Sequence, residues 1–170
     1  MTTIQNQIIN AYYQLTIESH EANITVSDII NRSQTSRSTF YRYFLDKFDV
    51  MNHVFLNDFN QETSLSIKNP VELITAILLT LSKRPIYYQR ILTLKCHNDF
   101  YNFLYHFISS QLTHLINEPS NSETMDILTT FASSAITYTS CQWIKSGQKR
   151  SIQQMTTVIT EALPLPLKTI

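Results

Sequence analysis

The chain of 170 residues contains a single glycine, Gly147. β-Hairpins and β-sandwiches place glycine at turns with a positive backbone φ, because other residues are strained there. A chain with one glycine cannot supply many such turns, so the sequence predicts an all-α fold. The composition, 43% hydrophobic and 15% charged, is sufficient to bury a core and is not that of a disordered tail.

Apolar residues recur at helical spacing between capping and helix-breaking residues. Thr25 is a predicted helix cap, with Asp28 at the third position facing the free backbone amides. Ser36 or Thr35 is expected to cap the next helix, and Asp46 the one after it. The predicted helices cover residues 3–18, 26–33, 37–44, 46–64, 70–83, 86–96, 98–116, 123–145 and 151–163.

One short segment combines aromatic rings with basic side chains: residues 29–47, IINRSQTSRSTFYRYFLDK. On a helical wheel of about 100° per residue, Phe40 and Phe44 fall on one side, where they can pack against the two preceding helices. Tyr41 and Tyr43 lie on the flanks. Two helices joined by a tight turn, with the second anchored by aromatic residues, are typical of a helix-turn-helix.

The opposite side of the same helix carries Ser38, Thr39 and Arg42. Arginine can bind guanine through two parallel hydrogen bonds, while hydroxyl groups and tyrosine can bind phosphate. The helix N-termini at Thr25 and Ser36 would add backbone amides directed at phosphates. Four basic residues and one acid lie between positions 32 and 47 of a chain with zero net charge, so the basic surface is local.

The longer segment ITVSDIINRSQTSRSTFYRYFLDKFDVM resembles the DNA-binding signature of the tetracycline-repressor (TetR) family of bacterial regulators. The resemblance covers about residues 5–56 and departs from the pattern in two places. The turn has Ser33 and Gln34 where the family often has Ala-Gly, and Tyr43 stands where histidine is common. Together, the residues and the resemblance give these predicted DNA-binding residues: Thr25, Ser36, Arg37, Ser38, Thr39, Tyr41, Arg42, Tyr43 and Lys47.

The resemblance also implies a division into two domains. Residues 1–48 would form the DNA-binding domain and residues 65–170 a ligand-binding and dimerisation domain, with the helix at about 46–64 connecting them. Family members dimerise through their last two long helices. The segment AITYTSCQWIKSGQKRSIQQMTTVITEAL is loosely similar to short members that include regulators of dihydroxyacetone kinase operons, at least one of them an activator that works with a partner protein.

Two apolar stripes could form a dimer seam, although an intramolecular core has the same periodicity. The predicted seam residues are Ile136, Trp143, Ile152, Met155 and Ile159. Aromatic residues in the middle of the chain could line a pocket for a small apolar or aromatic effector, and ordinary core is again the alternative. The predicted pocket residues are Phe55, Phe59, Tyr87, Tyr88, Phe100, Phe103, Phe107 and Phe131.

The sequence gives little indication of a metal site, an enzyme active site, a targeting segment or a disulfide framework. Cys96, His97 and His106 lack the tight spacing that zinc ligands favour, so no metal or cofactor is predicted. One glycine is too few for a glycine-rich phosphate loop or a nucleophile elbow, so an enzyme is not expected. The start of the chain lacks the pattern of a signal peptide, and no apolar run is long enough to span a membrane. Cys96 and Cys141 are too far apart to suggest a disulfide framework, so we expect buried thiols in the cytoplasm.

The sequence therefore predicts a transcriptional regulator, by default a ligand-responsive repressor that binds a palindromic operator in double-stranded DNA as a homodimer. Three alternatives stay open: an activator that works with a protein partner, a regulator without a ligand, and a helical interaction module with little DNA binding. Residues 1–60 contain four basic and six acidic residues, which keeps the interaction module under consideration.

Overall fold

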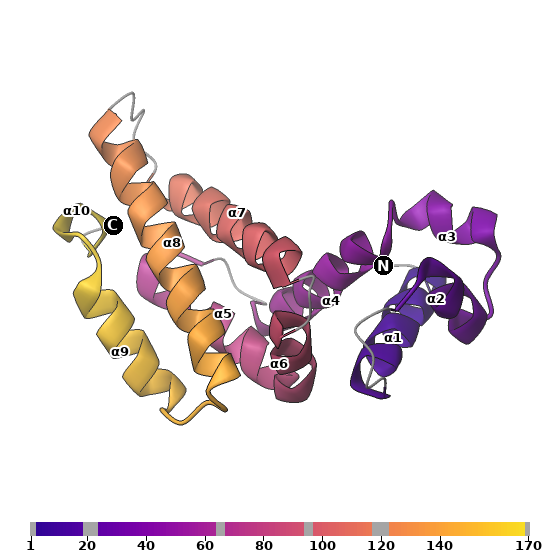
Figure 1. Cartoon of the computed structure of the whole chain (residues 1–170). Helices are drawn as coiled ribbons and strands as arrows, with labels where there is room; N and C mark the ends of the chain where they lie inside the picture. Colours follow the sequence, from indigo (N-terminus) through magenta and orange to yellow (C-terminus); the bar gives the residue numbers. More distant parts are fainter. Residues whose placement is uncertain (1–2, 19–23, 64–66, 94–96, 117–122, 169–170) are drawn as a thin grey trace.

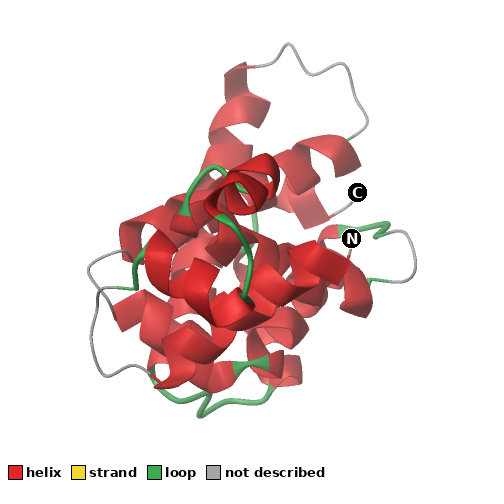
Figure 2. Ribbon diagram, turned by 90° about the vertical axis from the view of Figure 1, so that its right-hand side faces the viewer, coloured by secondary structure: helices red, strands yellow, loops and turns green. Residues whose placement is uncertain are grey.

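The computed structural model describes residues 3–18, 24–63, 67–93, 97–116 and 123–168. This part of the chain folds into helices joined by short loops (Figures 1 and 2), and the all-α prediction is confirmed. The helices are α1 (Thr3–Glu18), α2 (Val26–Ser33), α3 (Arg37–Tyr43), α4 (Lys47–Glu62), α5 (Pro70–Lys83), α6 (Pro85–Thr93), α7 (His97–Leu115), α8 (Glu123–Lys145), α9 (Ile152–Ala162) and α10 (Leu165–Lys168).

The capping residues predicted from the sequence begin the helices as expected. Thr25 and Asp28 form a reciprocal capping box at the start of α2, because each side chain accepts a hydrogen bond from the other residue's backbone amide. The Ser36 hydroxyl accepts from the Thr39 amide at the start of α3. The Asp46 carboxylate accepts from two amides at the start of α4. These local interactions fix where α2, α3 and α4 begin.

Positive φ angles mark two turns. Gln34 follows α2 with φ 53°, and Gly147 and Gln148 follow α8 with φ 80° and 56°. The predicted left-handed cap at Gly147 is confirmed. Gln34 occupies the position where the TetR pattern often has glycine, and it adopts the left-handed conformation that glycine would adopt easily. The turn between α2 and α3 therefore keeps a tight geometry despite the change of residue.

The helices gather in two groups along the molecule. In Figure 1, α1, α2 and α3 lie at one end, and α9 and α10 lie at the other. Helix α4 leaves the first group and packs against both α1 and α5. In the second group α7 runs along α8, while α9 lies against α5. Of the N-terminal helices, α1 and α4 make the main contacts with the second group.

Two expectations fall partly outside the described residues. The helix predicted over residues 86–96 begins at Pro85 and ends at Thr93, and Cys96 lies outside the described part of the chain. The predicted domain boundary near residue 65 also lies outside it. Within the described residues, no helix combines the length and the apolar character needed to cross a membrane.

Candidate nucleic-acid interface

Two aromatic residues fix α3 to the rest of the N-terminal group. Phe40 and Phe44 are 0% and 2% exposed, and their ring centroids lie 6.0 Å apart. The Phe44 ring also packs nearly perpendicular to the His53 imidazole on α4, at 5.1 Å between centroids. The two phenylalanines are core residues, as predicted, and their burial determines which side of α3 faces solvent.

Hydroxyl groups gather at the exposed start of α3. The Ser36 Oγ lies 3.0 Å from the Ser38 Oγ and 2.8 Å from the Thr39 Oγ1. The same Ser36 oxygen accepts from the Thr39 amide at 3.1 Å. The structure thus brings three predicted DNA-binding residues into one cluster, and each hydroxyl can still rotate to donate to or accept from a ligand.

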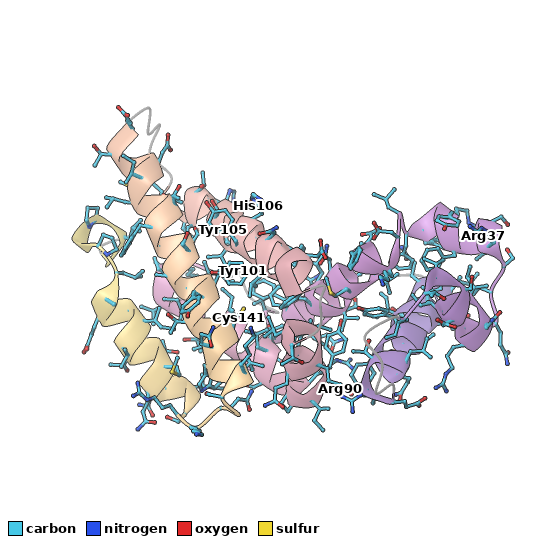
Figure 3. The ribbon with its side chains drawn as sticks, in the orientation of Figure 1. Arg37, Arg90, Tyr101, Tyr105, His106 and Cys141 are labelled. Carbon is cyan, nitrogen blue, oxygen red and sulfur yellow. The ribbon has the colours of Figure 1, made fainter. Side chains whose placement is uncertain are left out.

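The two arginines of α3 are exposed and rest against tyrosine rings. The Arg37 guanidinium carbon lies 5.5 Å from the centre of the Tyr41 ring, and that of Arg42 lies 4.9 Å from the centre of the Tyr43 ring. Tyr41 is 46% exposed. Figure 3 shows Arg37 on the outer edge of the molecule, away from α8 and α9. Cation–π contacts of this kind restrict a long side chain while its donors still face solvent.

Thr25 and Lys47 are engaged within the protein. The Thr25 hydroxyl donates to the Asp28 carboxylate at 2.6 Å, and these bonds lower the pKa of Asp28. The Lys47 ammonium donates to the backbone carbonyl of Ile24 at 3.0 Å. Lys47 therefore ties the start of α4 to the residue before the α2 cap. This places the two predicted phosphate contacts beside each other, since Ile24 and Thr25 are adjacent.

The balance of charge distinguishes α3 from its neighbours α2 and α4. Helix α2 has Asp28 in its first turn and α4 has Asp49, whereas the first turn of α3 contains no acid. Arg32 at the end of α2 forms an ion pair with Glu18 of α1. The exposed positive charge of this part of the chain is therefore concentrated on α3, where Arg37 and Arg42 lie.

The aromatic residues predicted to line a pocket form a packed cluster, with one exception. Centroid distances within the cluster run from 4.8 Å, between Phe59 and Phe107, to 6.5 Å, between Phe55 and Tyr88. The cluster joins α4, α6 and α7 and contains Phe55, Phe59, Tyr87, Tyr88, Phe100, Phe103 and Phe107. Phe131 does not belong with them, because it lies on α8 with 57% of its surface exposed.

The residues predicted for the dimer seam lie in the core of a single chain or pack against it. Ile136 is 0% exposed, and Trp143, Met155 and Ile159 are each 5% exposed. Ile152 packs against the same core from its edge. The Trp143 Nε1 donates to the Arg150 carbonyl at 2.8 Å, which closes the loop between α8 and α9. Four of these five side chains are therefore core residues of one chain, which leaves little of their surface for contact with a second copy.

A different face of α8 carries exposed apolar side chains. Ile127, Phe131 and Tyr138 are 62%, 57% and 57% exposed, and their spacing of four and seven residues places them along one stripe. Val158 on α9 is 48% exposed. Sequence reasoning did not place Ile127 and Phe131 on this stripe, because α8 carries apolar residues on both of its sides. The signal available was the pairing of Ile127 with Phe131 four residues later.

The part of the chain that the structure describes contains neither a reactive thiol nor a metal site. Burial raises the pKa of the Cys141 thiol to about 12, so this group stays protonated and unreactive at neutral pH. Within the described residues, no group of three or more His, Cys, Asp or Glu side chains is placed to hold a metal ion. Among the predicted site residues, those of α3 form an exposed polar surface.

Comparisons with known proteins identify the family of the C-terminal part and the overall fold. A family model of the C-terminal region of transcriptional regulators, TetR_C_8, matches residues 68–164. No curated protein sequence matches the chain significantly. Among solved structures, the dihydroxyacetone kinase operon activator DhaS is 21% identical with a TM-score of 0.68, covering 99% of this chain and 98% of that one.

Two further structures share the fold over nearly the whole chain. A TetR-family transcriptional regulator from Syntrophomonas wolfei is 19% identical with a TM-score of 0.60, covering 95% of this chain and 96% of that one. The fatty acid degradation regulator FadR from Bacillus halodurans is 16% identical with a TM-score of 0.58, covering 96% and 95%. The family resemblance inferred from the sequence is confirmed, and these relatives are regulators rather than enzymes, as predicted. Because the family model matches more than half of this chain, the chain belongs to the TetR family of transcriptional regulators.

Proposed function

We propose that this regulator binds a palindromic DNA operator as a homodimer in the cytoplasm, with residues 1–48 as the DNA-binding domain, α4 as the connector and residues 65–170 as the dimerisation and effector domain. The observation that carries the proposal is the two-sided character of α3. Phe40 and Phe44 bury one side, while Arg37 and Arg42 stand exposed on a helix without acid in its first turn.

Different contacts are assigned to different parts of this surface. Arg37, Ser38 and Thr39 lie at the exposed start of α3, the end that enters the major groove in helix-turn-helix proteins. Tyr41 and Tyr43 would bind backbone phosphates on either flank. Base contacts would select the sequence, and phosphate contacts would set the register of the protein on the duplex.

Thr25 and Lys47 are proposed to share one phosphate. Lys47 already donates to the carbonyl beside Thr25, so its ammonium needs only a small rotation to meet a phosphate there. The Asp28 carboxylate at the same helix start opposes an anion, because it is negatively charged and already accepts from the Thr25 amide. We therefore assign most of the phosphate affinity to the α3 side of the interface.

The exposed stripe on α8 is the proposed dimer seam. Ile127, Phe131 and Tyr138 would pack against the same residues of a second copy, with Val158 of α9 at the edge. A two-fold axis there reads two half-sites, which must lie about 34–36 Å apart to meet successive major grooves. Charges favour an antiparallel arrangement of the two α8 helices. Glu123 and Asp126 lie in the first turn of α8 and Lys145 lies in the last turn.

Repression relieved by a small apolar or aromatic effector is the proposed mode of action. The aromatic cluster includes Phe55 and Phe59 of α4, the helix that connects the two groups. An effector inserted among these rings would displace α4 and change the separation of the two α3 helices. Its leverage equals the difference between its affinities for the two arrangements.

A second candidate function is activation of transcription. DhaS, whose fold this chain shares, is named as an operon activator. The tight packing of the aromatic cluster, with centroids as close as 4.8 Å, also suits a protein in which a partner protein replaces the small effector. A thermal shift produced by small aromatic compounds would favour the repressor, since a ligand stabilises the fold that it binds.

Fluorescence anisotropy with DNA from upstream of the protein's own gene tests the proposal. We expect sequence-dependent binding that weakens steeply with salt, because phosphate contacts release counterions. Arg42→Ala should weaken binding by about 1–3 kcal/mol. Lys149→Ala removes an exposed charge in the loop between α8 and α9 and should leave affinity unchanged. Equal affinity for a scrambled duplex, or equal effects of the two variants, would contradict the proposal.

A further inference from the structure

One arginine at the corner between α5 and α6 contacts two other helices. Arg84 is the last residue before Pro85 begins α6. Its Nε donates to both oxygens of Asp58 on α4, at 2.8 and 3.0 Å. Its guanidinium carbon lies 4.3 Å from the centre of the Tyr13 ring on α1. We call Tyr13, Asp58, Arg84 and Tyr88 the Arg84 junction.

The carboxylate in this junction is buried, and a buried charge destabilises the fold unless its charged and hydrogen-bonding partners are all present. Asp58 is 0% exposed and also accepts a hydrogen bond from the Tyr88 hydroxyl at 3.1 Å. Burial alone would lower the pKa of Arg84, but its contacts with Asp58 and Tyr13 raise that pKa overall. Replacing a buried ion pair by apolar groups is often neutral or stabilising, so stability alone does not explain this pair, whose bonds hold α4 and the α5–α6 corner in one arrangement.

The junction holds the two helices that support the DNA-binding surface. Helix α2 packs mainly on α1 and α3, and α3 packs on α2, so both reach the second group through α1 and α4. Arg84 contacts α1 through Tyr13 and α4 through Asp58. A displacement of α1 against α4 would break one of these two contacts.

A second line of contacts restricts α1 in the same direction. The Arg90 Nη1 on α6 donates to the Thr16 carbonyl of α1 at 3.0 Å. The Tyr87 ring on α6 lies 5.6 Å from the Tyr13 ring, between centroids. Figure 3 places Arg90 at the end of α6 nearest α1. Helix α6 therefore faces α1 along its length, and the Arg84 junction lies at its first turn.

We propose that Arg84 is a positioning residue for DNA binding, which fixes the orientation of α1, α2 and α3 relative to the dimerisation domain by joining Tyr13 and Asp58. The inference rests on the proposed function, because orientation matters only if two half-sites are read together. Arginine suits the role better than lysine, since its planar group stacks on a ring while its Nε serves the carboxylate.

Two variants separate orientation from folding. Tyr13→Leu removes the ring under the guanidinium and leaves the buried Asp58–Arg84 pair intact. Arg84→Lys keeps a positive charge beside Asp58 and loses the planar stacking. The matched control is Lys83→Met, because the neighbouring Lys83 joins α5 to α4 through a partly exposed ion pair with Glu62 at 3.1 Å.

The primary measurement needs no DNA. Spin labels at Asn31 of α2 and Asn102 of α7, both exposed, report the distance between the two groups of helices in protein whose native cysteines are replaced by alanine. Diluting labelled chains with unlabelled ones isolates the distance within one chain. We expect a narrow distribution in the parent and the control, and a broader or shifted one in both junction variants.

Binding to DNA from upstream of the protein's own gene then tests the consequence. Inserting one base pair between the half-sites should weaken DNA binding by the parent more than DNA binding by the junction variants. The ratio of the Kd for the lengthened site to the Kd for the original site should be about tenfold smaller in the junction variants than in the parent. Unchanged distance distributions in both junction variants would overturn the inference, as would equal broadening in Lys83→Met. Broadened distributions without DNA binding by the parent would refute the proposed function and leave the positioning role of Arg84 supported.

Discussion

Removing the positive charge from the Arg84 junction should cost far more stability than removing a neighbouring surface charge. In Arg84→Met the Asp58 side chain, 1% exposed beside an arginine side chain that is 27% exposed, loses its partner. Breaking a buried pair typically costs 3–5 kcal/mol, because an uncompensated charge stays in the interior. Water reaches Arg84 in part, so we take the lower end, about 3 kcal/mol.

Urea denaturation followed by circular dichroism measures this loss. With a slope of about 2 kcal/mol/M, the midpoint should fall by about 1.5 M. Lys83→Met breaks the Lys83–Glu62 pair, whose side chains are 31% and 30% exposed, and should cost about 0.5 kcal/mol. The two variants lie on adjacent residues at the same helix end, so the comparison isolates burial of the partner carboxylate.

A double variant tests the cause. Asp58→Leu combined with Arg84→Met replaces both charges by apolar groups of similar size, and such replacements are often neutral or stabilising. We expect it to recover most of the stability lost in Arg84→Met. The reasoning is refuted if Arg84→Met and Lys83→Met lower the midpoint equally, or if the double variant is less stable than Arg84→Met alone.

Three further predictions concern other parts of the chain. Phe131→Asp should convert the dimer to a monomer in sedimentation velocity, and a dimeric Phe131→Asp would exclude the proposed seam. The control variant Ile86→Asp, at a residue 61% exposed on α6, should leave the dimer intact. Gln34→Gly should raise stability by about 0.5 kcal/mol, because relief of the left-handed strain slightly exceeds the entropy cost of glycine, and a lower melting temperature would contradict this. Cys141, in a Cys96→Ser background, should resist iodoacetamide in the folded protein at pH 8, and rapid labelling of the native thiol would show that it is not buried. Since the pKa of Cys141 rises from 9.0 to about 12 on folding, the stability of the fold should decrease as pH increases through that interval.

The parts of the fold that sequence reasoning predicted well depend on local interactions. Thr25 with Asp28, and Ser36 with Thr39, are capping pairs three residues apart, so their residue types and spacing are sufficient to place the helix starts. The sides of α3 follow from the same argument, because Phe40 and Phe44 are apolar and the opposite side is polar.

The parts that could not be predicted depend on contacts between distant segments. Asp58 and Arg84 are 26 residues apart, and nothing near either residue indicates that they meet. On α8, Ile136 and Phe131 are both apolar, and only the packing of α5, α6 and α7 decides that the first is buried and the second exposed. Lys47 has no local signal for its bond to Ile24, because that bond crosses 23 residues.

Trp143 is the one tryptophan of the chain, and it lies 5% exposed near the end of α8 with its indole nitrogen bonded to Arg150. Its fluorescence therefore originates entirely in the second group of helices. A shift of its emission on denaturation reports the opening of the α8–α9 loop, while circular dichroism reports helix content throughout the molecule. If the N-terminal helices unfold first, the two optical signals will give different midpoints, and the separation between them measures how tightly the two groups cooperate.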